Sequence, residues 1–405
     1  MKYSSFVLAL LAACGDDGGV NKLPDARPPD VASVTIQIGG VPAVNHTVYF
    51  QGPDGAEIAT VQTDANGVAS ALVQAGSSVT TLDVRKVRFN RPGRNVITIL
   101  GVQPGDDLML TGDHGLPTAD VTFTYPAFTG TNPQYGVITN CNNEEAGQGT
   151  STTRTVPRCS PRVDAMALVI DGLGGSEWYM SKPDQPFGDI DFTGETWTQV
   201  TPTTGSTYTN IATTAPVSSG HRITSPRGPL FTCWDRRDAR GPEYTAQHAC
   251  PPMPGATILD VLSFQEGSIT YEITHPLATA SPTLDVADTS IKALTNFTLD
   301  VAARTLALEL TTTGADPEFV VVHLESSELD WHVMAPFTSS SITLPRLLGD
   351  GAAHDLDADA PPYPLITTGI ATGGYDAIRR FGPHYLDSIT TEIARIITAT
   401  HNGDG

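Results

Sequence analysis

The chain has 405 residues, of which 40% are hydrophobic and 17% charged, a composition typical of a folded protein. Its 44 acidic and 23 basic residues give a formal net charge of -21. This balance excludes nucleic acid as the main partner, because a nucleic-acid-binding protein needs a basic surface. At roughly 100–200 residues per domain, the length predicts two to four domains.

The N-terminus carries a targeting signal. Met1 and Lys2 precede an apolar run at 6–11, and small residues stand directly before Cys14. These are the parts of a secretory signal, and the run is far shorter than the roughly 20 residues that span a bilayer. Leu-Ala-Ala-Cys resembles the lipobox of bacterial lipoproteins, whereas the alternatives are an ordinary cleaved signal or a chance cysteine.

The lipobox resemblance implies a signal peptide over 1–13 and lipidation, with palmitate among the acyl groups, at Cys14. It implies a protein of the cell envelope, anchored by lipid in the outer membrane, and leaves open which membrane face the protein occupies. A diacylglyceryl group plus an N-acyl chain would anchor it stably, since one acyl chain alone binds membranes marginally. Residues 14–32 are rich in Gly, Asp and Pro and predict a tether.

Four further cysteines form an even set in a chain with an export signal, which favours disulfides. Three connectivities are possible, and we expect the nearest-neighbour pairs Cys141–Cys159 and Cys233–Cys250, which close loops of similar length. A zinc cluster would need closely spaced cysteines such as C-x2-C, which the sequence does not contain. Free thiols are the other alternative.

Residues 33–112 predict an antiparallel β sandwich, because short alternating runs are separated by turn residues. The range resembles immunoglobulin-like and carboxypeptidase-regulatory-like modules of bacterial surface proteins. The resemblance rests on Gly40-Val41-Pro42, on Val48-Tyr49-Phe50 and on the Thr-Asp-Ala-Asn-Gly turn at 63–67. The expected strands cover 34–38, 47–50, 58–61 and 68–73.

Residues 113–256 predict a second β unit, whose runs at 121–128 and 135–139 resemble the first strands of a fibronectin type III module. Within this unit, residues 222–256 are rich in proline and predict a long irregular loop pinned by Cys233 and Cys250. Further strands are expected at 165–170, 197–200 and 207–211.

Residues 257–405 predict a C-terminal β-rich unit. The isoleucines at 389–397 fit a helix or a strand, and their mixture with Thr favours a strand. The chain is thus expected to be all-β, with tandem antiparallel sandwich modules, and the layout resembles lipoproteins of myxobacteria and their relatives. Strands are expected in this unit at 268–273, 305–310, 319–324 and 341–344.

The acidic loop 350–359 is the best candidate for a metal site, although we expect no metal or cofactor. Asp355, Asp357 and Asp359 alternate and could converge on Ca²⁺, which takes oxygen ligands. Ala360 and the missing closing Glu break the helix–loop–helix template, and a solvated loop is the alternative. A basic stretch at 85–94 could bind anionic lipid or lipopolysaccharide phosphate, or could be the solvent face of a strand.

No catalytic set is found, so we expect no enzyme. The histidines, including His221, His248, His275, His323 and His332, are scattered along the chain. The sequence contains no H-E-x-x-H, G-x-S-x-G, Walker A or dinucleotide motif, and Ser219-Gly220-His221 lacks the context of a hydrolase nucleophile.

The alternative function is an envelope glycan hydrolase or another carbohydrate-active protein, with carboxylates in 257–405 acting in facing pairs. Its candidates are Glu325, Glu328, Asp330 and Asp357. The first three stand close to Trp331, and carboxylates beside a Trp are more often at the surface than in a site.

The expected function is a structural or surface-binding role, with an envelope protein or a glycan as the partner. Long loops on β scaffolds often bind, so Trp234, Arg237 and Tyr244 in the 222–256 loop are the binding candidates. The alternative is that the aromatic residues of this loop cap the sandwich core.

Overall fold

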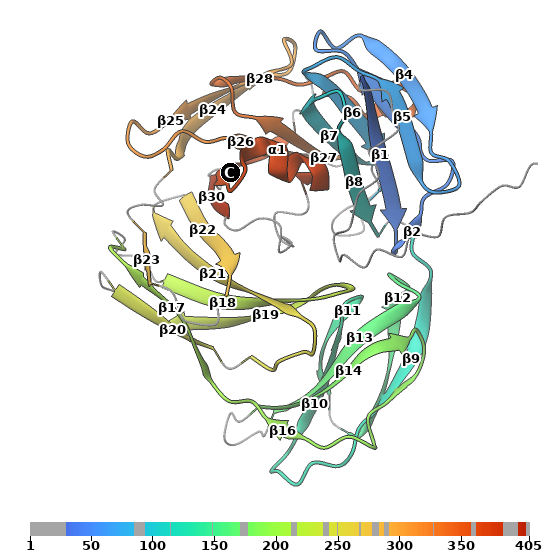
Figure 1. The fold of residues 1–405 in the computed structure, drawn as a ribbon, viewed down its shortest axis with the longest axis vertical. Coiled ribbons are helices and arrows are strands. Elements are labelled where there is room, and N and C mark those ends of the chain that lie inside the picture. Colours follow the sequence, from blue (N-terminus) through green and yellow to red (C-terminus); the bar gives the residue numbers. More distant parts are fainter. Residues whose placement is uncertain are drawn as a thin grey trace, which may run out of the picture.

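The computed structural model describes residues 30–84, 94–113, 115–147, 149–170, 177–211, 217–237, 243–248, 250–266, 269–277, 283–286, 291–326, 328–357, 362–383 and 396–401. Strand makes up 60% of the structure and helix 4%, which confirms the all-β prediction. In Figure 1, the described residues of 31–112 lie at upper right, those of 118–199 at lower right and those of 203–285 at lower left, while 294–310 and 341–343 lie at upper left. No helix in the described ranges has the length and apolar character of a membrane span.

One sheet of twelve strands, called the main sheet below, joins most of the molecule. Its strands, in spatial order, are β19 (Gly228–Arg237), β18 (Val217–Ser225), β21 (Thr257–Glu266), β22 (Ile269–Pro276), β30 (Ile396–His401), β29 (Tyr363–Ala371), β26 (Phe319–Glu325), β27 (Leu329–Pro336), β7 (Arg94–Val102), β6 (Ser77–Leu82), β3 (Thr47–Gln51) and β4 (Glu57–Gln62).

The described residues also form five smaller sheets. They contain β2 (Val41–Pro42), β1 (Val31–Ile38), β5 (Val68–Leu72) and β8 (Asp107–Gly112); β12 (Ser151–Pro157), β9 (Thr118–Thr124) and β15 (Ile190–Asp191); β11 (Asn142–Gly147), β10 (Gln134–Thr139), β13 (Arg162–Ile170), β14 (Glu177–Pro186) and β16 (Thr198–Gln199); β20 (Glu243–His248), β17 (Thr203–Thr209) and β23 (Thr283–Asp285); and β24 (Leu294–Asp300), β25 (Thr305–Leu310) and β28 (Ser341–Thr343). The helices in the described ranges are short: η3 (Gly349–His354), α1 (Gly374–Ile378) and η4 (Arg379–Phe381).

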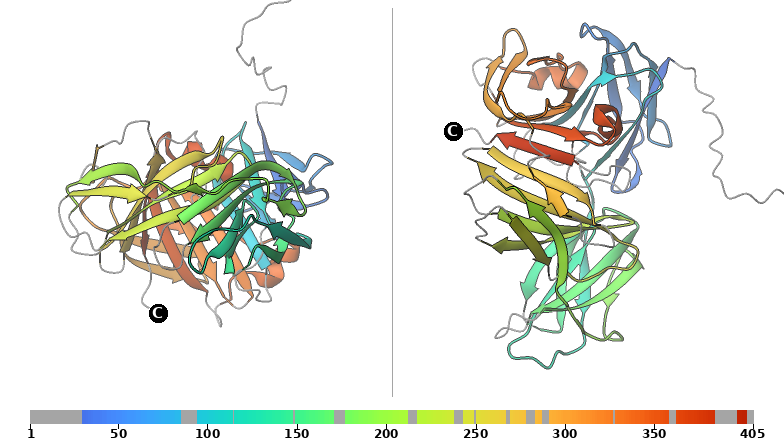
Figure 2. Two further views of the ribbon diagram at one scale, coloured as in Figure 1. Left: turned by 90° about the horizontal axis from the view of Figure 1, so that it is seen from below. Right: turned by 60° about the vertical axis from the view of Figure 1, so that its left-hand side comes forward.

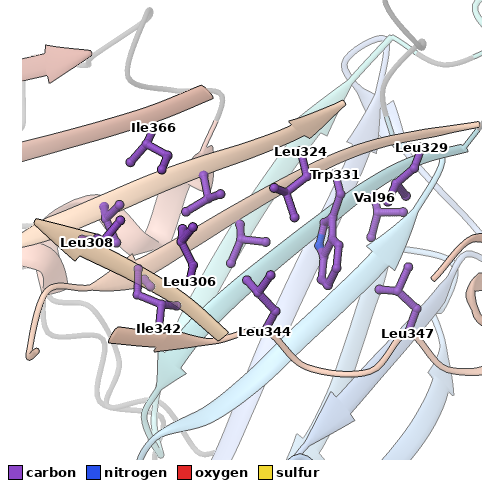
Figure 3. Close-up of a cluster of buried hydrophobic side chains, with 14 of the residues drawn as sticks. Val96, Leu306, Leu308, Leu324, Leu329, Trp331, Ile342, Leu344, Leu347 and Ile366 are labelled. Carbon is purple, nitrogen blue, oxygen red and sulfur yellow. The ribbon is translucent and has the colours of Figure 1, made fainter. Parts of the chain in front are cut away.

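Both faces of the main sheet are covered near β7 and β27. Met334 and Trp331 are three residues apart on β27 and therefore point to opposite faces. On the face of Met334, strands β1, β5 and β8 of the small sheet cover Phe50 and Ile99 of the main sheet. On the other face, β24, β25 and β28 cover the fully buried Trp331 (Figure 3), whose Nε1 donates to Thr98 Oγ1 at 2.9 Å.

The strands β9 to β16 form a sandwich of their own. Their two sheets enclose an aromatic core that includes Phe123, Tyr135 and Phe192. The predicted Cys141–Cys159 disulfide is present here, with a Cα–Cα distance of 5.3 Å. The right-hand view of Figure 2 shows this sandwich at the opposite end of the molecule from β24–β28.

The prediction of a long irregular loop at 222–256 is wrong, because strands β18, β19 and β20 occupy most of this range. The prolines fall where a missing N–H is tolerated. Pro226 lies in the turn between β18 and β19, Pro229 lies where their register shifts, and three others follow β20. The predicted Cys233–Cys250 disulfide is present, with a Cα–Cα distance of 5.8 Å.

The main sheet takes strands from all three predicted β ranges, 33–112, 113–256 and 257–405. The first range meets the third directly, since β7 and β27 pair in parallel from Arg94 opposite Leu329. The three ranges thus share one sheet, and their independence as domains stays a prediction. At 389–397, the two described residues lie in β30, as the strand interpretation expects; the others are outside the described residues.

Candidate metal centre

Histidines that are far apart in the sequence meet between two sheets. Across the main sheet, Asp260 of β21 pairs with His221 of β18 on one side and with His275 of β22 on the other. Directly opposed residues in antiparallel strands point to the same face. His248 enters from β20, in the small sheet that packs over this face through Tyr208 and its neighbours. Histidines that are scattered along the sequence are therefore brought together in space.

The side chains of His221, His248 and Asp260, called the inter-sheet site below, converge on a common point. The Nε2 atoms of His221 and His248 lie 3.9 and 4.0 Å from Asp260 Oδ1, too far for hydrogen bonds. One ligand atom from each residue lies within 4.8 Å of the other two. A point equidistant from three such atoms is roughly 2.3–2.5 Å from each, close to the about 2.0–2.2 Å of zinc bonds to imidazole and carboxylate.

The inter-sheet site is buried, yet some of its polar atoms have no hydrogen bond within the described part of the chain. His221 is 1% exposed and Asp260 is 0% exposed. Both ring nitrogens of His221 and Oδ1 of Asp260 lack a hydrogen-bond partner there. Leaving a buried donor or acceptor unpaired costs about 1–3 kcal/mol. Of these atoms, His221 Nε2 and Asp260 Oδ1 lie 3.9 Å apart, and an ion between them would satisfy both.

The electrostatics of the inter-sheet site suit a cation. Burial, followed by the nearby His248, lowers the pKa of His221 to about 4. Its imidazole is therefore neutral near pH 7 and can offer a lone pair to a metal ion. The rings of His221 and His248 are close, with centroids 3.9 Å apart, and the Asp260 carboxylate supplies negative charge beside them.

Hydroxyl and amide groups form the outer layer of the inter-sheet site. The backbone N–H of Ser206 donates to Asp260 Oδ2 at 2.9 Å, and its Oγ lies 3.4 Å from His275 Nε2. Ser219 Oγ lies 2.9 Å from the Tyr244 hydroxyl and 3.4 Å from His248 Nε2. His248 faces both Ser219 and Asp260 with the same atom, Nε2. In a serine-protease triad, one ring nitrogen of the histidine contacts the serine and the other contacts the aspartate. The arrangement is therefore not a nucleophilic triad.

A second histidine–aspartate cluster lies on β26 and β27. Asp330 Oδ1 accepts hydrogen bonds from His323 Nε2 at 2.7 Å and His332 Nε2 at 2.8 Å. Burial alone would raise the pKa of Asp330, but these hydrogen bonds outweigh it and hold the pKa well below its usual value. Asp330 is 3% exposed and Trp331 fully buried, so the expectation that this carboxylate is at the surface is wrong. Since histidines engage Asp330, the geometry does not favour it as one of a pair of glycosidase carboxylates.

The predicted calcium loop places its carboxylates differently. Both oxygens of Asp355 accept hydrogen bonds from Arg304, at 2.9 and 2.8 Å. The guanidinium thus occupies the position that a calcium ion would need. Asp357 is exposed, and Asp359 lies outside the described residues. Of the basic stretch 85–94, Arg94 alone is described, and it pairs with Asp83.

The predicted binding residues do not form a described surface. Tyr244 is buried in the sandwich core and bonded to Ser219, as the core-capping alternative expects. Trp234 and Arg237 belong to β19, but their side chains lie outside what the structure describes. Cys14 and the signal peptide also lie outside the described residues.

Comparisons with known proteins give no family. No protein-family description and no curated protein matches the chain. Among solved structures, the Bacillus anthracis TIE protein is 10% identical with a TM-score of 0.16, over 63% of this chain and 50% of that protein. The chain thus spans about half the length of that protein. A tetra-tandem repeat from the extending region of a large adhesion protein is 12% identical (TM-score 0.12, 87% of this chain, 96% of that one).

The Streptococcal ancillary pilin is 7% identical, with a TM-score of 0.14 over 76% of this chain and all of that one. TM-scores this low carry no argument about fold or function. The case for function therefore rests on the side chains of this protein.

Proposed function

We propose that this protein is a cell-envelope β protein that holds a divalent transition-metal ion between two of its sheets. The ligands are His221, His248 and Asp260, with His275 beside them. The observation that carries the proposal is the convergence of these buried groups while His221 and Asp260 keep atoms without a hydrogen bond to any described residue. An ion bound there would join β20 to β18 and β21, so its role is to stabilise the packing of the two sheets.

The donor set favours zinc. Two imidazoles and one carboxylate suit borderline ions such as Zn²⁺, whereas Ca²⁺ and Mg²⁺ prefer oxygen ligands alone. Disulfides point to an oxidising compartment, where a redox-inert ion is the stable choice. The three ligands are buried, and His275 lies beside them as a further imidazole, 3.9 Å from Asp260 Oδ2. With His275 as a fourth ligand the site would be a closed structural one.

The cell-envelope location in this proposal follows from the N-terminus, which resembles that of a lipoprotein. Lipidation at Cys14 would keep the protein at a membrane, with envelope proteins or glycans as its neighbours. Membrane fractionation tests the lipid anchor. A Cys14→Ser variant is expected in the aqueous fraction, and a variant that stays with the membrane would contradict the anchor.

Zinc content tests the metal site. The full chain is stripped with a chelator, saturated with Zn²⁺, separated from free ion, and assayed for zinc per chain by mass spectrometry. We expect His221→Gln to lose one zinc ion per chain relative to the unsubstituted protein. His46→Gln, outside both histidine clusters, is the matched control and should lose none. Stripping should also lower the melting temperature, because an ion that binds the folded state stabilises it.

Equal zinc in His221→Gln and in the unsubstituted chain would refute the site. Asp260→Asn offers a second, nearly isosteric variant, which keeps the hydrogen bond from the Ser206 N–H possible. Circular dichroism of each variant separates loss of the ion from loss of the fold.

A further inference from the structure

The hairpin of β26 and β27 carries a square of four metal-ligating side chains on one face. His323 lies directly opposite His332, and Glu325 lies directly opposite Asp330. Within each strand the two residues are two positions apart and so share a face. The sequence reads His-x-Glu on β26 and Asp-x-His on β27. This set is called the hairpin array below.

Three members of the hairpin array already meet at one oxygen. The Nε2 atoms of both histidines lie within 2.8 Å of Asp330 Oδ1, and the rings stack with centroids 4.1 Å apart. All three side chains are more than nine-tenths buried. Their ligand atoms lie within 4.8 Å of one another. Glu325 at the fourth corner is half-buried.

We propose that the hairpin array is a second binding site for a divalent transition-metal ion, with His323, Asp330 and His332 as ligands and Glu325 at the fourth corner. Two imidazoles and one or two carboxylates form the same donor class as the inter-sheet site. The proposal stands on a different set of residues and does not depend on the proposed function.

The two sites lie on opposite faces of the main sheet. Register pairs connect Ile269 to His401, His401 to Ile366, and Ile366 to Val322, which places these residues on one face. His275 is six residues from Ile269 on β22 and shares that face, with the inter-sheet site. His323 follows Val322 directly and therefore points to the other face. The sheet separates the sites, so each should fill independently.

The hairpin array should bind zinc more weakly than the inter-sheet site. An ion entering the array must replace two hydrogen bonds to Asp330, of 2.7 and 2.8 Å. At the inter-sheet site, the Nε2 atoms of His221 and His248 lie 3.9 and 4.0 Å from Asp260 Oδ1. An ion entering there breaks no hydrogen bond between these atoms. Calorimetric titration of stripped protein with Zn²⁺ should therefore resolve two events of different affinity.

Zinc counts in single-site variants test the second site. We expect two zinc ions per chain in the unsubstituted protein, one in His332→Gln and one in His221→Gln. Glu328→Gln is the matched control, because Glu328 is an exposed carboxylate outside the array. Glu325→Gln should weaken the second binding event at least several-fold while leaving the first unchanged.

The outcomes separate the two proposals. One zinc ion that is lost in His221→Gln and kept in His332→Gln overturns the second site and leaves the proposed function standing. One zinc ion that is lost in His332→Gln and kept in His221→Gln supports the hairpin array and overturns the inter-sheet site. If His332→Gln does not fold, nitrogen NMR of histidine-labelled unsubstituted protein decides. Nε2 signals of His323 and His332 that move on adding zinc support the site, and signals that stay unchanged overturn it.

Discussion

Asp64 stabilises the turn between β4 and β5 with its carboxylate. The backbone N–H groups of Val68 and Asn66 donate to its Oδ1 at 2.9 and 2.8 Å. These bonds, that of Val68 first, favour the ionised form and lower the pKa of Asp64 below its usual value. Because the pKa is lower in the folded state, the ionised carboxylate adds stability above about pH 4, and this stability is lost as the pH falls further.

We therefore expect Asp64→Ala to unfold at a lower urea concentration than the unsubstituted chain at pH 7. The difference should narrow at pH 3, where the carboxyl is largely protonated in the unfolded chain. Urea titrations of both proteins at the two pH values measure it. A difference of the same size at both values would show that the charge of Asp64 does not contribute.

The residues of the hairpin array show what sequence could and could not supply. His-x-Glu at the end of the strand expected at 319–324 is followed closely by Asp-x-His. This spacing is compatible with four polar side chains on one face of a hairpin, although no strand was expected over 329–336. That signal was available, and the surface prediction for Asp330 overlooked it. The inter-sheet site had no such signal, because His248 and Asp260 meet through sheet packing and not through spacing.

The sequence predicted the positions of strands better than the pairing between them. Alternation correctly indicated β25, because one of its faces is buried and the other is not. The apolar run at 47–50 correctly indicated β3, which is buried on both faces. The prediction failed at 222–256, where the proline content indicated a loop although β18 and β19 pair there. The order of the main sheet depends on long-range contacts, such as β7 with β27, that no local pattern encodes.

The Cys233–Cys250 disulfide connects the end of β20 to β19, beside the inter-sheet site. Cys250 stands two residues after His248, and the cysteines are 17 residues apart. Closing a loop of this size contributes roughly 3 kcal/mol in the chain-entropy model. We expect the double variant Cys233→Ser, Cys250→Ser to lose stability of about that size and also to release zinc from the inter-sheet site faster.

The other disulfide provides the control for that prediction. Cys141–Cys159 has a similar separation of 18 residues but joins the ends of strands in the β9–β16 sandwich. Its double serine variant should lose comparable stability in chemical denaturation and keep its zinc release rate. If both variants release zinc at the same rate, the Cys233–Cys250 bridge does not position His248.

At the scale of the whole molecule, the main sheet couples regions that the sequence divides into modules. Val96 of β7 is buried in the same core as Leu306, Trp331 and Ile342 (Figure 3), although more than 200 residues separate them. Composition and turn signals predicted the boundary near residue 112, because the 33–112 range has a sandwich pattern of its own. They could not show that one edge of this sandwich is continuous with β27.

A chain that begins at residue 113 tests this coupling. It would lack β7 and so expose the edge of β27, a row of unpaired backbone groups that favours association with other chains. It would also lose the partners of Trp331 in the shared core, including the Thr98 hydroxyl that accepts its indole N–H. Removing core partners of this kind costs several kcal/mol, and a typical domain is stable by about 5–15 kcal/mol. We therefore expect the shortened chain to aggregate or to melt well below the chain that retains residues 30–112, as size-exclusion chromatography and thermal denaturation would show. A shortened chain that stays monomeric with an unchanged melting temperature would instead establish 33–112 as an independent domain, joined to the rest by a contact that contributes little to stability.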